Sequence, residues 1–165
     1  MKWVKRIAIV LLVSLVVAQA IRPSRRNPPA DPAKELQAPQ PVMSIVQRSC
    51  YDCHSYHTAY PWYSQVAPVS WLLAKDVRDG RKEVNFSEWS TFTPRRTVRK
   101  LQEICEQVEW HEMPLKIYLP LHADANLTDA DRQTLCDWSK AERSRIIAEH
   151  PDAAPPPRER PPAGK

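Results

Sequence analysis

Residues 50–54 read Cys50-Tyr51-Asp52-Cys53-His54, a C-x-x-C-H stretch. Two cysteines three positions apart at a helix end project to one side, where their thiols can add to the two vinyl groups of one haem. The next residue, His54, then brings its imidazole under the iron as proximal ligand. In an exported chain this spacing is the attachment signature of haem c. We therefore expect one covalent haem on Cys50 and Cys53, with His54 bound to its iron.

Three other interpretations of this stretch are weaker. A disulfide-exchange C-x-x-C belongs after the strand of a βαβ unit, and no such pattern precedes Cys50. A zinc site needs one or two remote ligands, and the adjacent Cys53 and His54 chelate one ion poorly. A structural disulfide between the two cysteines leaves His54 unexplained. Covalent haem remains the favoured interpretation.

The amino terminus has the pattern of an export signal. Three basic residues among the first six precede an apolar run over residues 7–18, and Ala18-Gln19-Ala20 is a small-x-small cleavage pattern. The run is short for a bilayer span, which needs roughly 20 residues. Residues 1–21 are therefore a cleaved signal or a retained membrane anchor. We expect the rest of the chain in the periplasm, soluble if the signal is cleaved, or anchored on the periplasmic side of the bacterial inner membrane.

Proline and charge divide the remaining chain. Of the 17 prolines, 12 lie in residues 22–41 and 151–162. Residues 22–41 predict an extended tether, and residues 151–165 predict a disordered tail. Residues 42–150 are left as one domain with 14 basic and 15 acidic side chains, so the net charge of +5 comes from the ends. This balance argues against a nucleic-acid-binding domain.

Apolar periodicity within residues 42–150 predicts an all-α fold of about four helices. Three of the predicted helices cover about residues 42–53, 68–79 and 128–148. The other opens at residues 93–94 and keeps its apolar spacing to Val108, before Pro114 forbids its continuation. Gly80 is placed to end the second helix. Thr93 and Pro94 are a cap and a first-turn proline for the third, and Thr128 with Asp131 forms a capping box for the fourth. The scarcity of glycine argues against a β-sandwich or barrel, whose hairpins need Gly turns.

The sixth ligand of the iron decides the function. Met43 lies about two turns before the motif on the same predicted helix and does not easily reach the opposite haem face. Met113 follows the third helix and precedes a proline, which suits a ligand held on a loop. We favour Met113, with His57, His111 and His122 as alternatives. A core-filling role for Met113 is the structural alternative.

Aromatic side chains gather between residues 62 and 89. We expect five of them, Trp62, Tyr63, Trp71, Phe86 and Trp89, to wall the haem pocket, although ordinary core packing also explains each ring singly. Three cations, Arg78, Arg81 and Lys82, are candidates to pair with the haem propionates. Such a cluster is more often a solvated face.

Cys105 and Cys136 are left over once the motif cysteines carry haem. An even pair in an oxidising compartment is the usual setting for a disulfide. Cys105, however, lies on the apolar stripe of its helix, where a free buried thiol is common. We favour two unreactive thiols over a bridge.

Several blocks of sequence resemble the small bacterial haem-binding domain proteins, which are exported and cytochrome-c-like. The similar blocks are residues 50–55, 60–64, 67–72, 80–82, 85–89 and 112–114, with Tyr118 and His122. The resemblance implies one c-type haem on a small all-α fold, often with an N-terminal membrane segment, which favours a retained anchor. His57 and His111 stand where the family has other residues.

These observations predict an exported monohaem c-type protein that passes single electrons to a redox partner and is not an enzyme. The alternative is a haem-based sensor or ligand-binding domain in which the sixth ligand is displaceable.

Overall fold

In the computed structural model, which describes residues 2–154, all secondary structure is helical and that range contains no strand. The α-helices are α1 (Lys2–Ala18), α2 (Gln40–Ser49), α3 (Tyr51–His54), α4 (Val69–Glu83), α5 (Pro94–Glu109) and α6 (Asp129–Glu149). Short 3-10 turns lie between them: η1 (Trp62–Gln65), η2 (Phe86–Thr91), η3 (Leu119–Leu121), η4 (Ala123–Ala125) and η5 (Pro151–Ala153). The prediction of a small all-α fold is confirmed.

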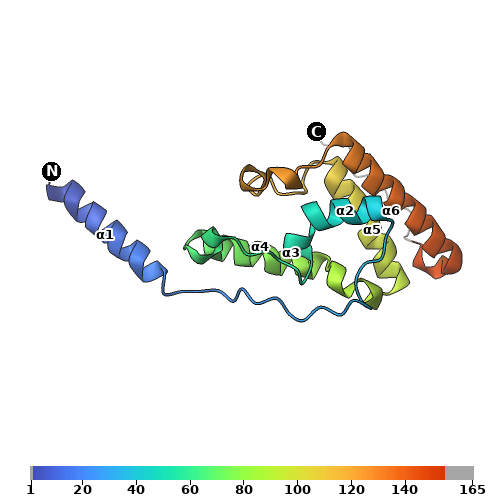
Figure 1. Ribbon diagram of the computed structural model, residues 1–165, viewed down its shortest axis with the longest axis horizontal. Helices are drawn as coiled ribbons and strands as arrows, with labels where there is room; N and C mark the ends of the chain where they lie inside the picture. Colours follow the sequence, from blue (N-terminus) through green and yellow to red (C-terminus); the bar gives the residue numbers. More distant parts are fainter. Residues whose placement is uncertain (1, 155–165) are drawn as a thin grey trace, which may run out of the picture.

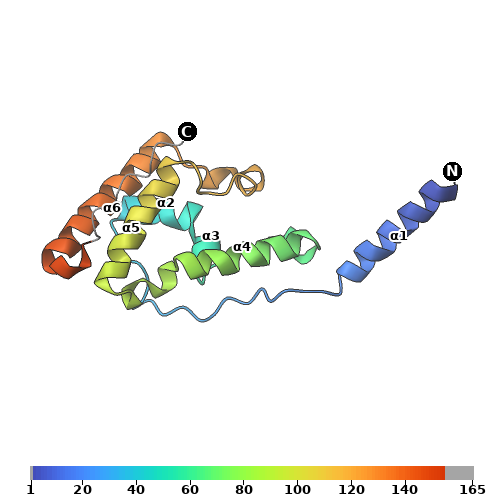
Figure 2. The same cartoon turned by 180° about the vertical axis from the view of Figure 1, so that it is seen from behind.

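The helices α5 and α6 lie side by side and form the largest packed unit (Figures 1 and 2). Both helices begin at the capping residues that the sequence predicts. The Thr93 side chain accepts from the Arg96 amide, and Thr128 and Asp131 form a capping box. These caps satisfy amide groups that a helix start leaves without partners.

A disulfide joins Cys105 of α5 to Cys136 of α6, so the expectation of two free thiols is wrong. Both residues are buried where the two helices meet. Helical periodicity places Cys136 at the edge of the apolar stripe, and only the packing of α6 against α5 brings it opposite Cys105.

The predicted helix over residues 42–53 is two helices. The backbone of Cys50 leaves helical geometry (φ −126°, ψ −32°), and the single turn of α3 does not continue the axis of α2 (Figure 1). Tyr51 of α3 is buried and stacks on Phe86 at 5.9 Å between ring centroids. Because of this break, α3 packs against η2 and α4 instead of continuing α2.

The proline-rich segments are partly integrated into the domain. The segment before α2 contains no helix or strand and is extended apart from a turn over residues 32–35, but Leu36 is only 1% exposed and its amide donates to the Phe86 carbonyl. Ala153, within the predicted tail, is also 1% exposed and packs with Val98, Leu101 and Ile146. The domain thus extends beyond residues 42–150 at both ends, while residues 155–165 of the tail lie outside the described residues.

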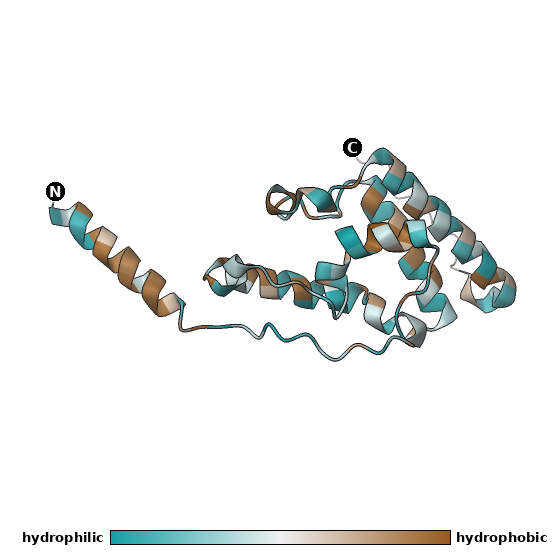
Figure 3. Cartoon of the chain, in the orientation of Figure 1, coloured by the Kyte–Doolittle hydropathy of each residue, from teal (hydrophilic) through white to brown (hydrophobic). Residues whose placement is uncertain are grey.

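Helix α1 stands apart from the other helices at the end of the extended segment (Figures 1 and 2). Its surface is largely apolar after the basic residues of its first turns (Figure 3), and none of its residues is buried. Within residues 2–154 no helix is both long enough and apolar enough to cross a membrane.

Candidate functional site

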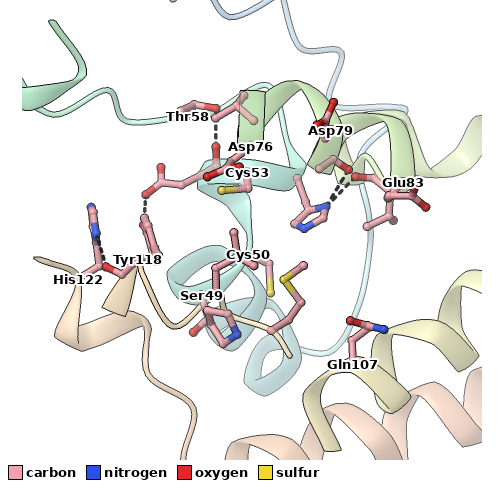
Figure 4. Close-up of a pocket in the computed structure, with 18 of the residues that line it drawn as sticks. Ser49, Cys50, Cys53, Thr58, Asp76, Asp79, Glu83, Gln107, Tyr118 and His122 are labelled. Carbon is pink, nitrogen blue, oxygen red and sulfur yellow. Dashed lines mark hydrogen bonds between the residues drawn. The ribbon is translucent and has the colours of Figure 1, made fainter. Parts of the chain in front are cut away.

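A cavity of about 860 Å³ lies between α4 and the segment that follows α5 (Figure 4). Its volume is within the roughly 300–1,000 Å³ typical of cofactor sites. Apolar side chains of α4, α5 and the following segment supply much of the wall, among them Leu72, Leu73, Val77, Ile104 and Leu115. The cavity suits an apolar ligand of cofactor size.

Cys50 and Cys53 are free thiols on the wall of this cavity (Figure 4). Burial, with repulsion from Cys53, raises the pKa of Cys50 to about 12. Burial, with repulsion from Asp52 and Asp76, raises the pKa of Cys53 to about 11. Both thiols are therefore protonated at neutral pH. This environment disfavours the thiolate on which disulfide exchange depends.

The imidazole of His54 lines the same cavity in a fixed orientation. Its Nδ1 lies 2.9 Å from the carbonyl oxygen of Gly80 and 3.1 Å from that of Val84. Because carbonyl oxygens only accept, Nδ1 carries the proton, and Nε2 has no hydrogen-bond partner in the described part of the chain. Burial lowers the pKa of His54, although the two carbonyls oppose this shift. The neutral ring with a free Nε2 is the form that binds a metal.

Gly80 permits this arrangement. A Cβ atom at Gly80 would lie 2.7 Å from the backbone oxygen of Cys53. Gly80 lies inside α4 and has no positive φ, so the prediction that it ends the helix is wrong. Its role is to let α3 approach α4 closely enough for His54 to reach the carbonyls.

Met113 also lines the cavity, on the segment after α5. The helix ends in a Schellman motif, in which the Glu112 amide donates to the Gln107 carbonyl (3.0 Å) and the His111 amide to that of Val108 (3.3 Å). His111 occupies the left-handed position, with φ 57°. The Met113 amide donates to the same Gln107 carbonyl at 3.2 Å, so the start of this segment is fixed to α5.

Two of the alternative ligands lie away from the cavity. His57 pairs with Glu35 and stacks on Tyr51. His111 is exposed, and neither histidine is part of the cavity wall.

The third alternative, His122, does line the cavity, but both its ring nitrogens have partners. Nδ1 lies 3.1 Å from the carbonyl oxygen of Tyr118, and Nε2 lies 3.0 Å from the hydroxyl of Tyr63. Of the four candidate sixth ligands, Met113 is thus the one that lines the cavity with its ligand atom unengaged by any residue of 2–154.

Residues 13–141 match the sequence model of one protein family, the haem-binding domain. The chain belongs to this family. The match covers most of the described domain and confirms the resemblance stated from the sequence. No curated protein and no solved structure matches the chain.

Haem binding is the property that the family assigns, and the residues of the cavity fit this cofactor. Two thiols and an imidazole with a free nitrogen share the wall of an apolar cavity of cofactor size. In the haem-binding domain the close approach at Gly80 serves to orient that imidazole.

Two of the five predicted wall aromatics, Tyr63 and Phe86, line the cavity of the haem-binding domain. Trp62 is 77% exposed and the Trp71 indole donates to the Ile21 carbonyl at 2.8 Å, contrary to the prediction for both. Trp89 is not part of the wall either and packs against Phe86 and Trp138 instead. Aromatic density along the sequence did not indicate which face of η1 and α4 each ring occupies.

The three candidate propionate cations are not part of the cavity wall. Arg81 donates to the Ser55 carbonyl (2.8 Å) and so fixes the turn after α3. Arg78 and Lys82 pair with Asp79 at the surface, in agreement with a solvated face.

Sequence reasoning missed two polar features of the wall. Lys100, only 6% exposed, is the one lysine or arginine that lines the cavity among the described residues, and its Nζ bonds Glu103 at 2.6 Å. Tyr118 donates to Asp52 at 2.6 Å. The spacing of Lys100 and Glu103 is visible in the sequence, but no sequence signal pairs Tyr118 with a residue 66 positions away.

Proposed function

We propose that this protein is an exported monohaem c-type cytochrome that carries single electrons. The observation that carries the proposal is the orientation of His54. Its Nδ1 is held by two backbone carbonyls, and no residue of 2–154 bonds its Nε2, which shares the cavity wall with Cys50 and Cys53. A histidine that binds a metal usually donates its other ring nitrogen in this way.

Cys50 and Cys53 would hold the haem through two thioether bonds. Support comes from their shared cavity and from the fact that they stay unpaired while the other two cysteines form a disulfide. A disulfide in a small domain is typical of an oxidising compartment, which favours export.

His54 and Met113 would supply the fifth and sixth ligands. A haem with one histidine and one methionine ligand provides one-electron chemistry at a raised reduction potential. The carbonyls of Gly80 and Val84 orient His54, and the Schellman motif fixes the Met113 backbone. With the chain supplying both ligands, the protein serves as an electron carrier rather than an enzyme, and its partner is a redox protein.

We place the domain on the periplasmic side of the inner membrane, with residues 1–21 as the export signal. Retention of this segment keeps the domain at the membrane, and cleavage after Ala20 releases it. The intact mass of the mature protein distinguishes these outcomes.

Covalent attachment is tested by co-expressing the full chain with c-type maturation machinery. After acid-acetone extraction and denaturing electrophoresis, peroxidase-active haem should remain on the polypeptide. The Cys50→Ser/Cys53→Ser variant should lose it, and the Cys105→Ser/Cys136→Ser control should keep it. Haem that is extracted from the unmodified chain would refute the proposal. Rapid carbon monoxide binding by the reduced, unmodified protein would instead favour a haem-based sensor.

A further inference from the structure

The cavity wall that carries Met113 is joined to the opposite wall by two side-chain hydrogen bonds within residues 2–154. The Tyr118 hydroxyl donates to Asp52 Oδ2 at 2.6 Å. The Tyr63 hydroxyl lies 3.0 Å from His122 Nε2. Because His122 Nδ1 faces the Tyr118 carbonyl and must donate to it, Nε2 accepts and Tyr63 donates.

The two residues that make these bonds from the Met113 side form one unit. The rings of Tyr118 and His122 are stacked, with centroids 3.7 Å apart and planes 7° from parallel. We call this pair the Tyr118–His122 clasp. Figure 4 shows both residues on the segment after α5. The Tyr118 hydroxyl reaches Asp52 and His122 Nε2 reaches Tyr63, so the clasp bridges the two walls on this side of the cavity.

The far end of the clasp is itself rigid. Asp52 lies between the two motif cysteines, and its Oδ1 accepts from the Ala59 amide at 2.8 Å. Its backbone carbonyl accepts from the Thr58 hydroxyl at 2.7 Å. The clasp therefore binds to a fixed point on the segment that the C-x-x-C-H stretch occupies, rather than to a mobile surface side chain.

The segment that bears Met113 is thus held at both ends. The Schellman motif fixes its start to Gln107, and the clasp fixes Tyr118, five residues after Met113. We propose that the clasp is the positioning device of the sixth ligand. With Tyr118 bound to Asp52, the segment stays over the cavity and keeps the Met113 thioether in place. When the clasp opens, the segment moves away and the sixth position becomes open to external ligands. This inference rests on the proposed assignment of Met113.

The test uses Tyr118→Phe in the full-length, haem-loaded protein, because this change removes one oxygen and keeps the stacked ring. A hydrogen bond to a charged group corresponds to about tenfold or more in an equilibrium. We expect the carbon monoxide affinity of the reduced protein to rise about tenfold. Amide hydrogen exchange over residues 112–122 should become faster by a similar factor. Tyr118→Phe/Tyr63→Phe should have a larger effect, and covalent haem should be retained.

Tyr56→Phe is the matched control, because the Tyr56 hydroxyl has no hydrogen bond in the described residues and its ring lies beneath Arg81. It should behave as the unmodified protein does. Unchanged carbon monoxide affinity and unchanged exchange in both clasp variants would overturn the inference. Failure of the Met113 assignment is seen separately, as the absence of a sulfur-to-iron charge-transfer band in the unmodified protein. Hydrogen exchange over residues 112–122 then still decides whether the clasp holds the segment.

Discussion

The carbonyl oxygen of Gly80 lies 2.9 Å from Nδ1 of His54, and the same glycine leaves the space that the Cys53 backbone occupies. One residue of α4 thus both orients the imidazole and admits the helix that carries it. A side chain at this position would disturb both the orientation of His54 and the packing of α3 against α4. The nearest atom to its Cβ is a backbone oxygen, which cannot rotate away.

The change Gly80→Ala should lower the stability of the protein, which is opposite to its usual effect in a helix. Glycine to alanine inside a helix normally stabilises a protein by about 0.5–1 kcal/mol. Here the added Cβ would meet Cys53 O at 2.7 Å, so we expect destabilisation of about 1–3 kcal/mol. Urea unfolding of the haem-loaded protein measures it. A gain in stability would contradict the close approach.

Met113→Ala should abolish the far-red sulfur-to-iron charge-transfer band and leave covalent haem in place. Loss of the thioether should lower the reduction potential on the order of 0.1 V, a fraction of the roughly 0.8 V range that axial ligands span. Visible spectra and redox titration measure both effects. His111→Ala serves as control, because His111 lies outside the cavity wall. An altered band in His122→Ala with an unchanged band in Met113→Ala would reassign the ligand.

The Cys105–Cys136 disulfide closes a loop of 31 residues. By the chain-entropy model it contributes about 3.5–4 kcal/mol, because it restricts the unfolded chain. We expect Cys105→Ser/Cys136→Ser to lose about this much in urea unfolding. Alkylation of the denatured, unreduced haem protein should add no alkyl group. Two added groups, seen by intact mass, would show free thiols instead.

His111→Gly should stabilise the protein. The φ of 57° at His111 is a left-handed conformation that glycine adopts without a Cβ penalty. We expect a gain of about 0.5–1 kcal/mol in the free energy of unfolding. The equivalent change at His150, which caps α6 with φ −134°, should bring no gain. Equal effects of the two changes on the unfolding midpoint would be inconsistent with the Schellman geometry.

The free energy of unfolding should also decrease in acid, because the Asp131 carboxylate becomes protonated. Burial raises the pKa of Asp131, but hydrogen bonds from Thr128 and Arg48 outweigh it and hold the pKa below the ordinary 3.8. A carboxyl with a lowered folded-state pKa stabilises the fold above its unfolded pKa. That stability disappears as the pH falls below about 4 through the folded-state value. Asp131→Asn should flatten the dependence of the melting temperature on pH below about 4, and an unchanged profile would exclude this contribution.

Local signals in the sequence predict much of the fold and of the proximal site. Thr93 and Thr128 mark helix starts because a capping side chain acts on its own next turn. Cys50, Cys53 and His54 gather on the cavity wall because their spacing alone places them together.

The features that escaped prediction depend on contacts between distant segments. Gly80 resembles a helix stop until α3 is seen packed against it, and Cys136 resembles an edge residue until α5 lies opposite. The positions of Trp62 and Trp71 were mispredicted for a similar reason, because the number of aromatic residues in a segment does not indicate the direction in which each ring points. A single sequence contains no signal for such pairings.

The disulfide between α5 and α6 has a consequence for biogenesis. If the chain is exported and carries haem as proposed, two of its four cysteines must form a disulfide and the other two must bind haem in the same oxidising compartment. A disulfide between the wrong partners would block the haem site. The fold separates the two pairs. One pair lies where two long, capped and sequence-adjacent helices meet, and the other lies on the wall of the cavity. Cys105 and Cys136 pair because α5 and α6, which follow one another along the chain, pack together. Cys50 and Cys53 then stay reduced and remain free to be joined to haem.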